Sequence, residues 1–302
     1  MPSPDFILYL QHGWADTSDA MQQFGEILAP HHLVIAPNLG WLKTWLRLEP
    51  LITQVESQVT ATLEQYPTTP LRVIGHSMGG IIWLELLNRH PAWCSHLHSL
   101  ILLASPIGGA DAARIIDPFG LGIGIARDLG INRRALAEKI AQQIPTLVIA
   151  GDIDQGSDGT ILVASTQFDY SQFIRVELPH PQLNAHPDLI PLIQAFWENP
   201  VISPPSPPSL VCTLIQQLRQ VEGITDAHPR DFPRSQKITN LGDGLELRLW
   251  KNALGVTHVF LGDKQGQCLY GGFVGWKDAS GLEQCLEEIV RQCGGREWGI
   301  DN

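Results

Sequence analysis

The sequence predicts a doubly wound, mostly parallel α/β domain followed by a small α+β domain. Three observations lead to this prediction. Short apolar runs alternate with amphipathic segments over residues 5–199, a proline-rich stretch follows at 200–209, and short strand-like segments then lie between two helical ones. Alternating strands and helices are typical of a parallel sheet with right-handed crossovers, whereas consecutive strands joined by short turns favour an antiparallel sheet.

The candidate strands of the first domain are short and apolar, without alternating polar residues. Such runs are expected where a strand is buried on both faces of a parallel sheet. They are Phe6–Leu10, Leu33–Pro37, Leu71–Ile74, Leu97–Ala104, Thr146–Ala150 and Phe173–Leu178. The clearest helical segments between them are Ser18–Ala29, Leu51–Gln65, Gly79–Arg89 and Pro187–Trp197. We therefore expect residues 1–199 to form one α/β domain.

A linker is predicted at residues 200–209, because five of these ten residues are proline. Proline ends helices and favours extended chain. Residues 210–302 then predict an α+β domain whose aromatic residues Trp250, Phe273 and Trp276 form its core or, alternatively, meet a protein partner. Its predicted elements are a helix at Leu210–Val221, strands at Glu246–Trp250, Thr257–Leu261 and Cys268–Val274, and a helix at Leu282–Gln292.

Composition excludes several classes of protein. The net charge of −11 disfavours a nucleic-acid binder, which needs a basic surface to displace counterions. No apolar run approaches the roughly 18 residues that span a bilayer, and the amino terminus lacks the pattern of a signal peptide. The five cysteines are widely spaced and include no CxxC pair, and no metal or nucleotide motif occurs. We expect a soluble cytoplasmic protein without metal or cofactor.

The strongest chemical signal is the run Gly75-His76-Ser77-Met78-Gly79-Gly80. It directly follows a predicted strand and opens a predicted helix, which is the context of a G-x-S-x-G nucleophile elbow. Residues two positions from the serine must be very small, because strand and helix approach each other closely at this turn. The alternative is a glycine-rich structural turn.

A second signal lies at the end of the first strand, where Gln11 is followed by His12-Gly13-Trp14. An oxyanion hole takes one backbone N–H from the residue after the nucleophile and one from this early loop. Met78 and Trp14 are the candidates for these donors. His12 is interpreted as a buried residue that holds the loop by hydrogen bonds, rather than as a catalytic base.

Together these two segments resemble the α/β-hydrolase superfamily, and in particular its lipase and esterase branch. The stretch Leu102–Gly109, which contains Ser105-Pro106, also resembles the turn that leads into the lid of lipase-like members. The resemblance covers about residues 5–199. It implies the α/β-hydrolase fold, here with short or absent antiparallel strands at the amino-terminal edge, a lid at about 107–141, and a Ser-Asp-His triad in that chain order.

The triad acid is expected after the strand Thr146–Ala150, where two aspartates compete. Asp158 fits the spacing of lipase-like members, whereas Asp154 fits another pattern that is common in the superfamily. We favour Asp158 and interpret the other aspartate as a turn former or helix cap.

The triad base is expected after the last predicted strand. His180 matches the family's His-x-x-Leu pattern, and His186, which precedes a proline, is interpreted as a surface or capping residue. The family often has glycine before this histidine, where this chain has Pro179, so the path of the loop can differ.

Other residues near the site have two readings. The first half of the predicted lid, Ile115–Ile125, is apolar and glycine-rich and could close an acyl pocket, or simply pack on the core. Arg133 and Arg134 could meet an anionic substrate, although a solvated helix face is the simpler interpretation. Trp41 and Trp45 could border the pocket, although plain packing is simpler.

These residues predict a serine hydrolase that cleaves acyl esters of small molecules through a covalent intermediate. The same triad could serve a thioesterase, amidase, acyltransferase or cofactor-free haloperoxidase, because specificity depends on the lid and pocket. A different possibility is an interaction module that has kept the fold but not the activity, with the carboxy-terminal domain meeting a protein partner.

Overall fold

A computed structural model describes residues 4–109 and 125–293. The chain divides into two compact units, one up to Pro205 and the other from Ser206 onward. This division falls inside the proline-rich stretch. Each unit has its own sheet and its own buried clusters, so the two are described separately.

The first unit contains a six-stranded sheet in the order β2-β1-β3-β4-β5-β6, in which every pair of neighbours is parallel. The predicted α/β fold is therefore confirmed, and the described residues add no antiparallel strand to this sheet. Its strands are β1 (Ile7–Gln11), β2 (Leu33–Ile35), β3 (Leu71–His76), β4 (Leu97–Leu103), β5 (Thr146–Gly151) and β6 (Gln172–Val176). Its helices are α1 (Asp19–Leu28), α2 (Leu48–Gln65), α3 (Met78–Arg89), α5 (Ile125–Leu129), α6 (Arg134–Ala141), α7 (Val163–Thr166) and α8 (Leu189–Glu198).

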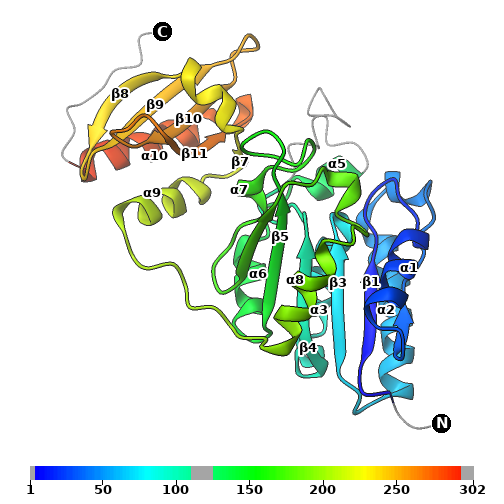
Figure 1. The fold of residues 1–302 in the computed structure, drawn as a ribbon. Coiled ribbons are helices and arrows are strands. Elements are labelled where there is room, and N and C mark those ends of the chain that lie inside the picture. Colours follow the sequence, from blue (N-terminus) through cyan, green and yellow to red (C-terminus); the bar gives the residue numbers. More distant parts are fainter. Residues whose placement is uncertain (1–3, 110–124, 294–302) are drawn as a thin grey trace. The chain divides into compact units, whose positions relative to one another are not determined.

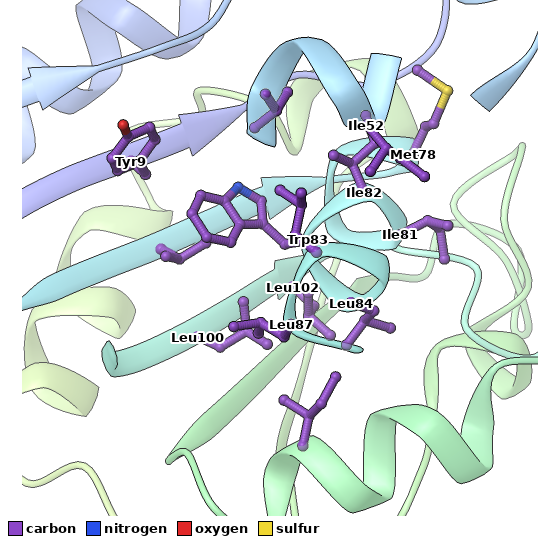
Figure 2. Close-up of a cluster of buried hydrophobic side chains, with 14 of the residues drawn as sticks. Tyr9, Ile52, Met78, Ile81, Ile82, Trp83, Leu84, Leu87, Leu100 and Leu102 are labelled. Carbon is purple, nitrogen blue, oxygen red and sulfur yellow. The ribbon is translucent and has the colours of Figure 1, made fainter. Parts of the chain in front are cut away.

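Helices cover both faces of this sheet (Figure 1). Side chains of α2, α3 and α6 pack on one face, and those of α1 and α8 pack on the other. Figure 2 shows Trp83 of α3 beside Tyr9 of β1 in the first of these clusters, and their ring centroids are 5.4 Å apart. Burial on both faces explains why the central strands are rich in apolar residues.

The edge strands β2 and β6 depart from that expectation. Their side chains are only partly buried, and Phe173 of β6 is exposed. An edge strand has a neighbour on one side only, so its apolar residues are less completely covered than those of β1, β3, β4 and β5.

The second unit is a five-stranded antiparallel sheet in the order β7-β11-β10-β9-β8, with helices packed on one face. Phe273 is buried and Trp250 packs on the other face, but Trp276 is 69% exposed, so its assignment to the core was wrong. The short strand β7 and the polar edge strand β8 were not predicted. The elements are α9 (Leu210–Arg219), β7 (Thr225–Asp226), β8 (Gln236–Leu241), β9 (Leu245–Lys251), β10 (Thr257–Gly262), β11 (Cys268–Phe273) and α10 (Ala279–Gln292).

Across the described ranges, no helix combines the length and the hydropathy required to cross a bilayer.

Candidate active site

The candidate site residues follow the carboxyl ends of four parallel strands. Trp14 comes after β1, Ser77 after β3, Asp158 after β5 and His180 after β6. Carboxyl ends of parallel strands meet at one edge of the sheet, where open α/β folds bind ligands. Residues that are far apart in the sequence are therefore brought to the same edge.

Ser77 occupies a sharp turn between β3 and α3. Its backbone has φ 54° and ψ −123°, in the left-handed half of conformational space that non-glycine residues rarely adopt. A Cβ on Gly79 would lie 2.1 Å from the carbonyl oxygen of Gln11, and one on Gly75 would lie 2.6 Å from the backbone of Gly80. The elbow therefore requires glycine on both sides of the serine, as its sequence predicted.

Ser77, His180 and Asp158 form a continuous chain of polar contacts. His180 Nε2 lies 3.1 Å from Ser77 Oγ, and His180 Nδ1 lies 2.7 Å from Asp158 Oδ2. With Nδ1 protonated, the imidazole donates to the carboxylate and leaves Nε2 free to accept the serine proton. This arrangement can activate a hydroxyl as a nucleophile.

Several hydrogen bonds fix the position of Asp158. Its Oδ1 accepts hydrogen bonds from the backbone N–H groups of Thr160 (2.9 Å) and Ile161 (2.6 Å), and its side chain is almost completely buried. The backbone N–H of His180 donates to the Asp158 carbonyl oxygen at 2.9 Å. The carboxylate therefore keeps one oxygen for the histidine while backbone dipoles stabilise its charge.

The competing residues are placed elsewhere. Asp154 accepts from the backbone N–H of Ser157 at 2.7 Å and from its hydroxyl, and so shapes the turn before Asp158. His186 accepts from the backbone N–H of Asp188 at 3.3 Å, just before α8 begins. These are the turn-forming and capping roles that the sequence offered as alternatives.

Two backbone N–H groups are available beside Ser77. Met78 is the first residue of α3, so its N–H belongs to the first turn, whose donors have no partner within the helix. The N–H of Trp14 has no hydrogen-bond acceptor among the described residues. Gly13 brings this loop against the nucleophile, because a Cβ on Gly13 would lie 2.8 Å from Ser77 Cβ. Trp14 directly follows Gly13 and Met78 directly follows Ser77, so both N–H groups belong to the segments that meet at the nucleophile.

His12 is fully buried and stabilises the loop before Trp14. Its Nδ1 donates to the Gly13 carbonyl oxygen at 2.9 Å, and its Nε2 accepts from the N–H of Leu39 at 3.0 Å. Burial lowers the pKa of His12, so the ring is neutral. It cannot serve as a base toward Ser77, because its accepting nitrogen is occupied by Leu39.

His76 makes a contact that sequence reasoning missed. Its Nε2 donates to the backbone carbonyl oxygen of His180 at 3.2 Å, and the two imidazole centroids are 4.8 Å apart. Burial, with a further contribution from His180, lowers the pKa of His76 well below its usual range. A neutral ring therefore anchors the backbone of the candidate base. The sequence placed His76 in the elbow, but nothing in it indicated a partner 104 residues away.

Three of the cysteines differ from an activated nucleophile. Burial raises the pKa of Cys268 and Cys285 to about 11 and also raises that of Cys94, so these thiols stay protonated near neutral pH. In the described part of the chain, no group of three or more His, Cys, Asp or Glu side chains is arranged to hold a metal ion.

The arginine pair is neither solvated nor free for a substrate, so both readings of it were wrong. Arg133 and Arg134 are buried. Arg133 Nε lies 2.6 Å from Glu85 Oε1, and Arg134 donates to the carbonyl oxygens of Ala164 and Gln167. Both side chains attach the start of α6 to other parts of the domain.

A cavity of about 150 Å³ is lined in part by Arg133. Its lining includes none of Trp14, Ser77, Asp158 and His180. Every arginine in its lining has a carboxylate partner, so its charges compensate one another. The three ion pairs are Arg47–Asp128 (3.0 Å), Arg89–Glu49 (2.5 Å) and Arg133–Glu85 (2.6 Å).

The predicted lid is described only in part, because residues 110–124, which hold most of its apolar half, lie outside the described ranges. Trp41 and Trp45, for which plain packing was the simpler reading, are instead 47% and 38% exposed.

Comparisons with known proteins agree with this architecture. A family model described as serine aminopeptidase, S33, matches residues 40–122, which include Ser77 but neither Asp158 nor His180. No curated protein matches the sequence. The fold is similar to the mature form of a lipase from Bacillus licheniformis, with a TM-score of 0.50 and 14% identity, over 65% of this chain and 93% of the lipase.

The propeptide form of that lipase gives a TM-score of 0.52 and 12% identity, over 85% of this chain and 59% of the lipase. Since 85% of the chain is more than the 205 residues of the first unit, this match continues beyond that unit. At such low identity, both likenesses concern the fold.

Proposed function

We propose that this chain, which has the fold of the α/β-hydrolases, hydrolyses acyl esters of small molecules through Ser77, His180 and Asp158. The observation that carries this proposal is the unbroken contact from Ser77 Oγ to His180 Nε2 and from His180 Nδ1 to Asp158, at 3.1 and 2.7 Å. The strained backbone of Ser77 supports it, because strain of this kind is concentrated at functional sites.

In the proposed first step, His180 Nε2 takes the proton of Ser77 while Oγ attacks the ester carbonyl carbon. Asp158 holds the imidazole in the tautomer that this transfer requires and stabilises the imidazolium that results. The protonated His180 then gives the proton to the departing alcohol, and an acyl-serine remains.

The negative charge that develops on the carbonyl oxygen is proposed to be bound by the N–H groups of Trp14 and Met78. The amino-terminal end of α3 adds its positive dipole at the same place. Water, activated in turn by His180, then releases the acid and regenerates Ser77.

The test is turnover of p-nitrophenyl butyrate by the full chain and by Ser77→Ala. We expect Ser77→Ala to lower kcat/KM by about a thousandfold or more, with an unchanged thermal unfolding temperature. Undiminished turnover in a folded Ser77→Ala protein would contradict the proposed role of Ser77.

Labelling with a fluorophosphonate probe separates the enzyme from an inactive module of the same fold. An adduct on Ser77 in the native protein and its absence after denaturation support an activated serine. Absence of any adduct on the folded protein favours the interaction module. Parallel assays with a thioester, an amide and an added alcohol acceptor distinguish esterase, thioesterase, amidase and acyltransferase activities.

A further inference from the structure

Three indole rings form a row that begins at the candidate oxyanion donor and ends in solvent. The ring centroids of Trp14 and Trp45 are 4.3 Å apart, and those of Trp45 and Trp41 are 5.6 Å apart. Trp14 packs partly against the core cluster that contains Met78, whereas Trp45 and Trp41 are 38% and 47% exposed. We name Trp14, Trp45 and Trp41 the tryptophan row.

The turn that carries the outer two rings is fastened to the oxyanion loop. Thr44 is completely buried, and its hydroxyl donates to the carbonyl oxygen of Trp41 at 2.6 Å and accepts from the N–H of Ala15 at 3.1 Å. Ala15 directly follows Trp14. The turn that carries Trp41 and Trp45 is therefore fixed to the loop of Trp14 by a buried polar side chain.

We propose that the tryptophan row binds the apolar chain of the substrate, and that the substrates are esters of medium- or long-chain unbranched acids. This inference rests on the proposed ester hydrolysis. A carbonyl oxygen bound by the N–H of Trp14 lies next to that residue, so a chain attached to the carbonyl can continue across the rings of Trp45 and Trp41. Each methylene group that leaves water there adds favourable free energy.

The substrate chain fits this row better than a lipid surface or a second copy of the protein does. The row starts at Trp14, which carries a candidate oxyanion donor, and the exposed charged residues Lys43 and Arg47 lie within and beside the same turn. A broad interface would be expected to use the whole turn. Such an interface would include Leu42, which is 75% exposed but, having no aromatic ring, is not part of the tryptophan row.

Leu42 therefore supplies a matched control. The experiment compares kcat/KM for p-nitrophenyl acetate and p-nitrophenyl octanoate in the wild-type chain and in Trp45→Ser, Trp41→Ser, Trp45→Phe and Leu42→Ser. We expect Trp45→Ser to lower the octanoate-to-acetate ratio of kcat/KM about tenfold, because the longer chain loses an apolar contact that acetate does not make. Trp41→Ser should lower the ratio less, and Trp45→Phe and Leu42→Ser should keep it close to that of the wild type.

An unchanged octanoate-to-acetate ratio in both Trp45→Ser and Trp41→Ser overturns this inference but leaves the proposed ester hydrolysis intact. Equal losses on acetate and octanoate also overturn it, because they indicate a structural effect on the oxyanion loop. If the ratio is unchanged but Leu42→Ser and Trp41→Ser both lose sedimentation with phosphatidylcholine–phosphatidylglycerol vesicles, the turn serves a lipid surface instead. Failure of the wild-type chain to hydrolyse acetate in a Ser77-dependent manner removes the proposed function first, and this inference with it.

Discussion

Asp158 and His180 are joined twice, once through side chains and once through the backbone. His180 Nδ1 lies 2.7 Å from Asp158 Oδ2, and the His180 N–H donates to the Asp158 carbonyl oxygen at 2.9 Å. The second bond sets the position of the histidine backbone relative to the aspartate, so the imidazole is oriented before a substrate arrives. Because the imidazole is already oriented, it does not have to reorient during the chemical step.

This relationship predicts different outcomes for the two competing aspartates. Asp158→Asn keeps an oxygen for the backbone donors but no longer stabilises the protonated His180, so kcat for p-nitrophenyl butyrate should fall about 10³- to 10⁴-fold. Asp154→Asn, the matched control, should change kcat less than about threefold. A larger loss of kcat in Asp154→Asn than in Asp158→Asn would identify Asp154, not Asp158, as the triad acid.

His76 is predicted to act as a positioning residue through its hydrogen bond to the His180 carbonyl oxygen. His76→Leu should lower kcat about three- to tenfold with little change in KM, because one hydrogen bond that orients the base is lost. His76→Gln can supply an N–H at a similar place and should recover most of kcat. If the two variants have equal kcat, the hydrogen bond is not the cause.

Acid should destabilise the fold through His12 and His76. Burial depresses both pKa values in the folded state, so below pH about 6.5 the unfolded chain binds protons that the folded chain does not. The free energy of unfolding should therefore fall as pH decreases below this value, by at most about 1.4 kcal/mol per pH unit for each histidine. Urea unfolding at pH 7.5 and 5.5 measures this slope. In His76→Gln the slope should be smaller, and an identical slope would contradict a buried neutral His76.

Substitution of Gly79 should disrupt the elbow. The Cβ in Gly79→Ala would lie 2.1 Å from the Gln11 carbonyl oxygen, so the start of α3 must move away from β1, at a cost of about 1–3 kcal/mol in unfolding free energy. We also expect ester turnover to fall at least tenfold. Gly275→Ala is the control, because a Cβ on Gly275 meets no atom within 4 Å. Equal effects of the two substitutions in urea unfolding would argue against the steric explanation.

Much of the fold could be predicted from local pattern. The central strands and the helices that cover them were found because burial on both faces leaves runs of apolar residues, as at Leu100–Leu103 of β4. Strand β8 was missed because it is an exposed edge whose residues, Gln236–Leu241, carry little apolar signal. The burial of Arg133 was also missed, because its partner Glu85 lies 48 residues away.

By itself, the sequence determined the α/β order of elements and the elbow around Ser77, because these depend on periodicity and on side-chain size at neighbouring positions. It also narrowed the candidate acid to Asp158 or Asp154 and favoured His180 over His186 as the base. Only the tertiary structure decided which of them lie within hydrogen-bond distance of one another, and only it revealed the contacts of His76 and the tryptophan row. Those contacts join separate loops, whose distances depend on how the strands are ordered in the sheet rather than on how they follow one another in the chain.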